Sequence, residues 1–174
     1  MKNIIIVDKR GNSFGEETLE NSIQKKLIRR VARIFVFNSQ GELFLQQRST
    51  KVRAWPGRWD NSAGGFLDPG ETIAQAARRE LQEELGIKEV ILKKRFDLYN
   101  EEKDLGRIVF INFETIFTVI YDGAIRPDRE EVAGGRGITL EKLNKEMKQN
   151  PRSFSPGFVN AFQRYQKDLK RKQR

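Results

Sequence analysis

The sequence contains neither cysteine nor histidine. Disulfides, thiolate catalysis, and any site that uses imidazole as a base or a metal ligand are therefore excluded. Chemistry must come from Asp, Glu, Lys, Arg or Tyr, or from a metal held by oxygen ligands. Long apolar runs are also missing, since the longest, Ile4 to Val7 and Phe117 to Tyr121, are far too short to cross a bilayer. We expect a cytoplasmic protein with no membrane partner.

The chain of 174 residues is long enough for one domain with a substantial core. We predict that residues 29–165 form this domain, with an N-terminal strand and connecting segment (1–28) packed on it and a basic tail at 166–174. The net charge of +9 favours polyanionic partners such as nucleotides or nucleic acid. Much of the excess lies between Arg164 and Arg174, so nucleic-acid binding does not follow from the charge alone. A monomer and a homodimer are both compatible with the sequence.

Apolar patterns bounded by turn residues predict a mixed sheet covered by helices, which is the α/β class. The predicted strands are Asn3–Val7, Val31–Phe37, Glu42–Gln47, Val90–Asp97 and Arg107–Tyr121, the last being one bent strand or two strands that meet at a kink. Glu101–Leu105 is expected to be a charged turn, and Ser13–Lys26 and Gly123–Gly137 are expected to be connecting segments. Helices are predicted from Thr139 to Met147 and from Pro156 onward. In the last helix, the core-facing positions are Phe158, Phe162, Tyr165 and Leu169.

The strongest helix signal begins at Thr72. Thr72 and Gln75 fit a capping box, and Gly86 occupies the position where a left-handed residue ends a helix. With about 100° per residue, the apolar stripe contains Ile73, Ala77, Leu81 and Leu85. Three acids lie on or beside this inward stripe: Glu80, Glu83 and Glu84.

Three glutamates on or beside the apolar stripe are energetically unfavourable. Like charges three and four residues apart repel each other, the C-terminal half of a helix disfavours anions, and partial burial adds to the cost. A solvated acidic face is the simplest alternative, but it does not explain why the acids lie on the stripe. A divalent cation does explain it, and oxygen ligands at this density suit Mg²⁺ or Mn²⁺. The preceding Gly64-Gly65 pair lets the backbone approach a metal or a phosphate.

These residues resemble a complete Nudix box. The match consists of Gly65, then Glu71 after five residues, then after seven more Arg79-Glu80-Leu81-x-Glu83-Glu84-x-Gly86-Ile87. The flanking hairpin and the segment W-P-G-x-W-D-x-S-A-G-G are similar to this family too, so that the resemblance extends from Arg29 to Phe162. It implies a Nudix-type α/β/α sandwich with a mixed β-sheet. It also implies metal-dependent hydrolysis of a pyrophosphate bond in a nucleoside diphosphate, free or linked to another moiety.

The resemblance implies roles for individual residues. Glu80, Glu83 and Glu84 correspond to metal-binding and base-providing glutamates, and Glu80 is our prediction for the base. Arg79 corresponds to an arginine that orients these acids, and Glu71 to an acid that supports the loop. Gly64 would offer its carbonyl to the metal.

A further metal ligand is expected from the late loop, where many family members supply another acid. Glu130 and Glu131 are the candidates, and we predict Glu131. A solvated charge run is the alternative there.

Substrate contacts are predicted for Arg48 and Arg53, with Lys51 beside them, because these cations can bind phosphate. Trp59 or Trp55 could stack on a base, although anchoring of the loop or core is the commoner use of tryptophan. Phe66 follows the glycine pair and is expected to line the pocket.

Three alternative functions are open. One is a pyrophosphohydrolase that acts on RNA 5′ ends and uses the basic tail. A second is an isomerase, since the N-terminal layout also resembles isopentenyl diphosphate isomerases; these use a cysteine and a histidine-rich metal site, both absent here. The third is a nucleotide-binding module without catalysis, for which three clustered acids have no use.

Overall fold

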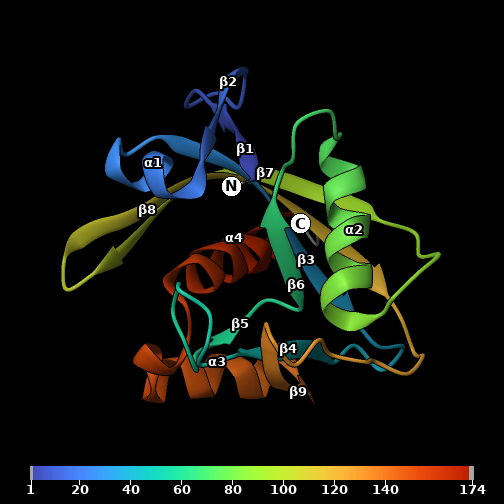
Figure 1. The fold of residues 1–174 in the computed structure, drawn as a ribbon. Helices are drawn as coiled ribbons and strands as arrows, with labels where there is room; N and C mark the ends of the chain where they lie inside the picture. The colour runs from blue at the N-terminus through green and yellow to red at the C-terminus, as the bar shows by residue number, and fades with distance from the viewer. Residues whose placement is uncertain (1, 173–174) are drawn as a thin grey trace.

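The computed structural model describes residues 2–172 as a curled mixed sheet with helices on both faces (Figure 1). Its strands are β1 (Asn3–Val7), β2 (Ser13–Thr18), β3 (Ile28–Phe37), β4 (Leu43–Arg48), β5 (Trp59–Asp60), β6 (Ala63–Phe66), β7 (Lys93–Asp104), β8 (Arg107–Ile120) and β9 (Val132–Ile138). Its helices are α1 (Leu19–Gln24), α2 (Ile73–Leu85), α3 (Leu140–Gln149) and α4 (Pro156–Lys172), with a 3₁₀ turn at Pro151–Ser153. Among these helices, none is long and apolar enough to span a membrane.

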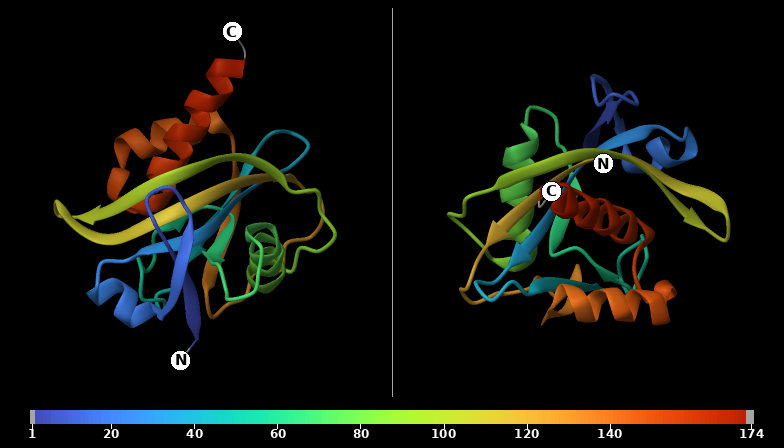
Figure 2. Two further views of the ribbon diagram at one scale, coloured as in Figure 1. Left: turned by 90° about the horizontal axis from the view of Figure 1, so that it is seen from above. Right: turned by 180° about the vertical axis from the view of Figure 1, so that it is seen from behind.

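Strand β3 is the centre of the sheet. It pairs in parallel with β8, from Arg29 opposite Asn112 to Phe37 opposite Ile120, and antiparallel with β1, β4 and β6. Strands β7 and β8 form a long antiparallel hairpin, while β4 pairs with β5 and β9. The views from above and behind show α2 and α4 on opposite sides of this sheet (Figure 2). The predicted α/β/α sandwich is therefore confirmed.

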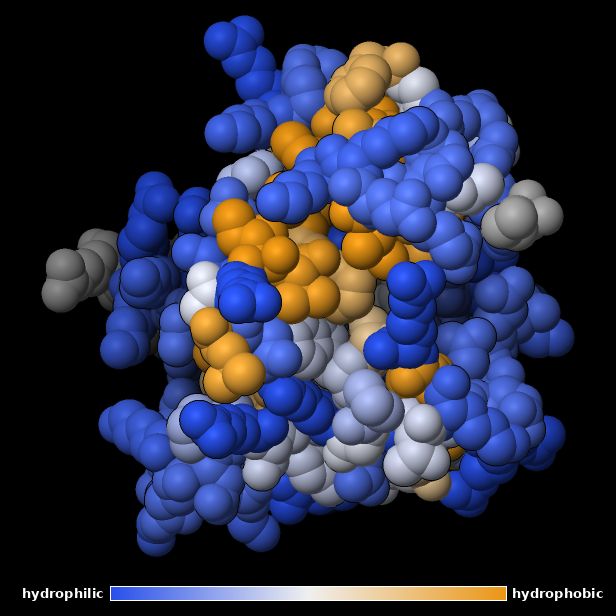
Figure 3. Space-filling view, turned by 60° about the vertical axis from the view of Figure 1, so that its left-hand side comes forward, coloured by the Kyte–Doolittle hydropathy of each residue, from blue (hydrophilic) through white to orange (hydrophobic). Residues whose placement is uncertain are grey.

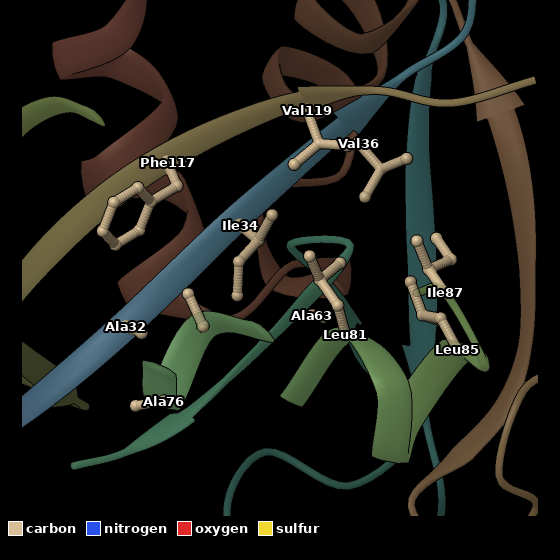
Figure 4. Packing of buried hydrophobic residues seen from close by; sticks show 11 residues of the cluster. Ala32, Ile34, Val36, Ala63, Ala76, Leu81, Leu85, Ile87, Phe117 and Val119 are labelled. Atoms are coloured by element: carbon tan, nitrogen blue, oxygen red, sulfur yellow. The ribbon is translucent and has the colours of Figure 1, made fainter. Parts of the chain in front are cut away.

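The side chains of β3 contribute to two hydrophobic cores, because successive side chains of a strand point to opposite faces of the sheet. The first core lies on the α2 side and the second core on the α4 side. On one face, Ile34 and Val36 pack with Leu81 and Leu85 of α2 (Figure 4). On the other face, Phe35 packs edge-on against the rings of the last helix, including Phe158, Phe162 and Tyr165. The predicted inward positions of both helices are confirmed, and α2 is fixed to the sheet by its apolar stripe.

Most of the predicted strands are confirmed, and Arg107–Tyr121 forms one continuous strand, β8. The turn expected at Glu101–Leu105 is wrong, because β7 continues to Asp104. The chain reverses one step later, at Leu105 and Gly106, which both have positive φ angles (46° and 80°). Of the charged residues in this stretch, Lys103 and Asp104 are exposed near the end of the hairpin, whereas Glu102 is buried and pairs with Arg33.

Two predicted connecting segments are also wrong. Ser13–Lys26 contains β2 and α1, and the Thr18 side chain caps α1. Gly123–Gly137 contains β9, which pairs with β4. One glycine of β9 has a packing reason: a Cβ on Gly135 would lie 2.0 Å from Cζ of Phe44. Glycine adds nothing to the apolar pattern from which a strand is predicted. At Gly135 the missing side chain makes room for an aromatic ring of the neighbouring strand.

The C-terminal residues continue α4 through Lys172, so most of the segment predicted as a basic tail is helical. Leu169 packs against the second core, as predicted. The last two positions of the predicted tail, 173 and 174, lie outside the described residues.

A buried ionic cluster is centred on Arg33 of the central strand β3. Arg33 donates to Asp60 Oδ1 (3.2 Å) and to Glu102 Oε1 (2.9 Å), and its Nε lies 2.9 Å from Glu114 Oε2 as an ion pair. This third contact is not aligned as a hydrogen bond. Burial, opposed by Arg33 and reinforced by Glu102, raises the pKa of Glu114 to about 7. One guanidinium thus faces three carboxyl groups, and the deepest of these holds a proton near neutral pH.

Replacement of Glu114 by glutamine is expected to remove a pH dependence of stability. The folded pKa of Glu114 exceeds the unfolded value, so the folded state binds more protons and loses stability as pH rises from about 4.5 to 7. This loss amounts to about 3 kcal/mol for the wild type. Urea unfolding at pH 5 and pH 8 should show that Glu114→Gln flattens this dependence. An unchanged slope would contradict the buried, protonated carboxyl.

Candidate active site

Helix α2 is positioned by both of its ends. The Thr72 side chain accepts from the Gln75 N–H, the Gln75 side chain accepts from the Thr72 N–H, and Gly86 closes the helix at φ 68°. The capping box predicted from the sequence is therefore confirmed. The two caps fix where the helix begins and ends, and the packing of its apolar stripe fixes the direction in which the acids point.

Arg79 organises the loop and the acids. Its Nε and Nη2 bind both oxygens of Glu71 (2.9 and 3.1 Å), and Nη2 also donates to the Phe66 carbonyl (3.0 Å). Its Nη1 donates to Glu80 Oε1 (2.6 Å) and to Glu83 Oε2 (3.2 Å). The hydrogen bonds from Arg79 hold the pKa of Glu71 below its usual value. Glu71 therefore stays ionised and holds the Arg79 side chain in place.

Glu80 and Glu84 are the two buried acids, with 8% and 4% of their surfaces exposed. Glu84 accepts from Gln46 Nε2 (2.9 Å) and from the Gly64 N–H (3.2 Å). Burial raises the pKa of Glu84 well above its usual value, and the charge of Glu80 raises it further. Burial also raises the pKa of Glu80, against the influence of Arg79. The folded protein thus keeps two carboxyl groups where their negative charge is poorly stabilised.

Gly65 makes the space that Glu80 occupies. A Cβ at this position would lie 2.0 Å from Glu80 Oε1 and 2.3 Å from its Cδ. The glycine is therefore required by close approach of a functional side chain, which explains its place in the motif.

The variant Gly65→Ala is expected to lower kcat by about tenfold or more with little change in melting temperature, since the new methyl group displaces a flexible carboxylate and not the backbone. Steady-state kinetics and thermal unfolding measure both effects. Gly134→Ala in β9 is the matched control, because nothing lies within 4 Å of its added Cβ. Equal kinetics for the two variants would contradict a role for the position of Glu80.

The donor set fits a hard divalent cation. Glu80, Glu83 and Glu84, together with Glu131, line one pocket of about 270 Å³. Within residues 2–172, no three acids already converge as a chelate; Glu80 and Glu83 share Arg79 instead. Oxygen-only ligands at this density nevertheless match Mg²⁺ or Mn²⁺, and a cation would relieve the unfavourable charge on the two buried acids.

The pocket lined by Glu80, Glu83, Glu84 and Glu131 is called the acidic pocket below. The loop before β9 contributes one of its two candidate acids to this pocket. Glu131 lines the acidic pocket, its charge raises the pKa of both Glu80 and Glu84, and its carbonyl accepts from the Ser49 N–H (2.8 Å). Glu130 points outward, with 72% of its side chain exposed, and pairs with Lys51. The structure thus places the predicted Glu131 at the site and Glu130 away from it.

A second pocket, of about 370 Å³, adjoins the acidic one. Residues that line both pockets are Arg48, Val52, Gly64, Gly65, Phe66 and Glu131. On the side where α1 and the β7–β8 hairpin lie, apolar side chains gather around a hollow (Figure 3). We call the larger, more apolar pocket the side pocket; it is lined by α1, the β7–β8 hairpin and the loop after β4.

The predicted substrate residues divide into two groups. Arg48, Arg53 and Phe66 line the side pocket, where Arg48 also donates to Asp60 Oδ2 (3.2 Å). Trp59 lies elsewhere, among the residues of the second core, with Arg136 over its ring at 4.4 Å.

Trp55 is the tryptophan that lines the side pocket. It donates from Nε1 to Glu102 Oε2 (2.6 Å) and packs edge-on against Phe110. Sequence reasoning missed the contributions of Phe110 and Arg29 to this pocket. Phe110 lies within a predicted strand and Arg29 just before one, where the apolar pattern gives no signal for a pocket.

The chain belongs to the Nudix family. The family model described as the NUDIX domain matches residues 27–158. The chain is 31% identical over 159 residues to an uncharacterized Nudix hydrolase of Pseudomonas aeruginosa, covering 91% of this chain and 90% of that relative. Membership of the family confirms the predicted class of enzyme, a Nudix pyrophosphohydrolase, whose members generally use divalent metals.

Relatives in the same family carry out different reactions. The chain is also 31% identical over 156 residues to an isopentenyl-diphosphate Delta-isomerase of Serratia proteamaculans, covering 90% of this chain and 87% of that protein. The fold is shared with the NUDIX domain of Shewanella oneidensis NrtR, crystallised with ADP ribose. That structure aligns with a TM-score of 0.63 at 15% identity, covering 88% of this chain and 99% of the domain. Overall similarity thus defines the family and leaves the substrate open.

Proposed function

We propose that this enzyme hydrolyses the pyrophosphate bond of a nucleoside diphosphate that is linked to another moiety. The observation that carries the proposal is the adjacency of the acidic pocket and the side pocket, which share six lining residues. One pocket suits a metal-bound diphosphate and the other suits a ring system among aromatic side chains. The ADP ribose bound by the NrtR domain is a ligand of this kind.

Each residue of the site has a proposed role. When bound, Mg²⁺ or Mn²⁺ would supply neutralisation of the diphosphate charge and a lowered pKa for a water molecule. Glu80, Glu83, Glu84 and Glu131, with the Gly64 carbonyl, are the proposed metal ligands. Arg79 and Glu71 are positioning residues, because they act by holding Glu80 and Glu83.

Proton transfer is assigned to Glu80. Its carboxylate lies in the acidic pocket, and the burial that raises its pKa makes it a better proton acceptor than an exposed glutamate. Arg48 lines both pockets and is the proposed cation for the bridging phosphates. Arg53, Phe66 and Trp55 are proposed to contact the nucleoside.

Isomerase activity is the competing function that the relatives suggest. Cysteine and histidine are absent from this chain, so an isomerase site built on those residues cannot form. We therefore expect no conversion of isopentenyl diphosphate in the presence of Mg²⁺ or Mn²⁺. Appearance of dimethylallyl diphosphate above the level of an enzyme-free control would contradict this expectation.

The test of the proposed function is a substrate panel. Nucleoside diphosphates, diphosphate sugars, dinucleoside polyphosphates and triphosphorylated RNA are incubated with Mg²⁺ or Mn²⁺, and the products are identified by mass. Cleavage of a pyrophosphate bond that stops on addition of EDTA supports the proposal. A panel with no cleaved member would contradict it.

An RNA substrate would involve the basic residues near the end of α4. Truncation after Leu169 removes the last cations and keeps the leucine that packs on the core. If RNA is cleaved by the full chain and equally well by the truncated chain, the basic segment has no part in binding it.

A further inference from the structure

Arg29 is a buried arginine whose terminal nitrogens have no hydrogen-bond partner in the part of the chain that the structure describes. Only 2% of its surface is exposed. Its single hydrogen bond is a long one, from Nε to the Ile111 carbonyl (3.4 Å). Among residues 2–172, neither Nη1 nor Nη2 donates to an acceptor, and no carboxylate lies within ion-pair distance of the guanidinium, although the charges of Glu102 and Glu114 act on it from farther away.

Three other arginines of the described chain that are buried or half-buried have acceptors for their terminal nitrogens. Arg33 binds three acids, and Arg79 binds both oxygens of Glu71. The neighbouring Arg30 donates to the Phe113 carbonyl (3.1 Å) and to Thr115 Oγ1 (2.6 Å). An arginine that leaves water usually finds such acceptors, because a buried donor without a partner is costly. Arg29 is the exception that needs an explanation.

Aromatic rings stabilise the charge of the Arg29 guanidinium but do not pair its N–H groups. The Arg29 carbon Cζ lies 4.7 Å from the centre of the Phe110 ring and 5.5 Å from that of Phe66. Such rings stabilise a cation through its flat faces. The N–H groups point outward in the plane of the guanidinium, so their hydrogen-bonding capacity remains unused.

The position of Arg29 indicates where the missing partner would come from. Arg29 lines the side pocket together with Trp55, Phe66 and Phe110. Phe66 also lines the acidic pocket, so that the arginine lies one ring away from the proposed diphosphate site. A ligand held by its diphosphate over the acids would extend its other end toward this arginine.

We propose that Arg29 is a specificity residue that binds a phosphate monoester carried by the nucleoside of the substrate. The substrate class is then a nucleoside diphosphate-linked compound with an additional phosphate on its ribose. A guanidinium suits this role, because its paired N–H groups match two phosphate oxygens. The proposal rests on the proposed function only in assigning the side pocket to the nucleoside.

Burial is the reason this contact should discriminate strongly. Water competes poorly in a pocket where the guanidinium is enclosed by two rings, so a charge-assisted hydrogen bond is stronger there than at the surface. A ligand without the phosphate leaves the arginine unpaired and gains nothing in return.

Ligand binding without metal tests the proposal independently of turnover. Isothermal titration compares AMP with adenosine 2′,5′-bisphosphate and adenosine 3′,5′-bisphosphate for the wild type, Arg29→Gln and the control Arg30→Gln. We expect the wild type and the control to bind one bisphosphate about tenfold or more tightly than AMP, and Arg29→Gln to lose this preference. Arg29→Lys should restore part of it, because lysine keeps the charge and loses the planar fork.

Equal affinities for all three nucleotides in the wild type would overturn the proposal, and so would a preference that survives in Arg29→Gln. A preference for GMP over AMP that disappears in Arg29→Gln would also overturn it, because Arg29 would then recognise a base edge. The outcome is separable from the proposed function. If bisphosphate selectivity depends on Arg29 but no pyrophosphate bond is cleaved, the anion site stands and the hydrolase assignment fails.

Discussion

Glu84→Gln is expected to lower kcat by about a hundredfold or more and to leave the melting temperature unchanged or raised. The activity falls because a neutral amide cannot replace an ionised ligand of a divalent cation. The fold persists because an amide can keep both contacts of Glu84: its oxygen accepts from the Gly64 N–H, and its NH₂ donates to Gln46 after that side chain rotates. Removal of one of two repelling buried carboxyl groups favours the folded state.

Glu130→Gln is the matched control for this loss. Glu130 is a loop glutamate that pairs with Lys51 at the surface and does not line the acidic pocket. Its activity should remain within about twofold of the wild type, since an exposed ion pair contributes little. Near-normal turnover by Glu84→Gln, or equal losses in the two variants, would refute the assignment of Glu84 as a metal ligand.

Arg33→Met is expected to destabilise the protein by about 3–5 kcal/mol, the cost of breaking a buried ionic cluster from one side. The substitution leaves Asp60, Glu102 and Glu114 without the cation that they share. Methionine fills much of the volume but offers no donor. Urea unfolding at pH 7 measures the change in the free energy of unfolding.

Lys25→Met is the control for this stability loss. Lys25 pairs with Glu17 at the surface, with 58% of the lysine side chain exposed, and its removal should cost less than about 1 kcal/mol. A loss of similar size in the two variants would show that Arg33 has no special role. The double variant Arg33→Met with Glu114→Gln should recover part of the loss, because it removes one of the stranded acids.

The sequence predicts the acidic helix well because its signals are local. Thr72, Gln75 and Gly86 define where α2 begins and ends, and the apolar stripe defines its rotation. From these alone, Glu80 and Glu84 are expected on the buried side, where the structure places them. Local patterns suffice here because one helix supplies three of the proposed ligands.

The features that were not predicted depend on contacts distant in sequence. Strand β9 requires glycine at position 135 because Phe44 of another strand occupies the space that a side chain would need. Arg33 lies within an apolar run, and its three acids come from β5, β7 and β8. The role proposed for Arg29 likewise depends on Phe66 and Phe110, which lie beside it only in the folded structure. No spacing rule within the sequence connects such residues.

The most direct test of the account is a crystal grown or soaked with Mn²⁺ and measured for anomalous scattering. We expect a peak at coordination distance, about 2.0–2.2 Å, from the carboxylates of Glu80 and Glu84, because these buried acids are the proposed core of the metal site. The same peak should be absent from Glu84→Gln crystals. A peak at other residues, or no peak at Glu80 and Glu84 in the wild type, would contradict the account.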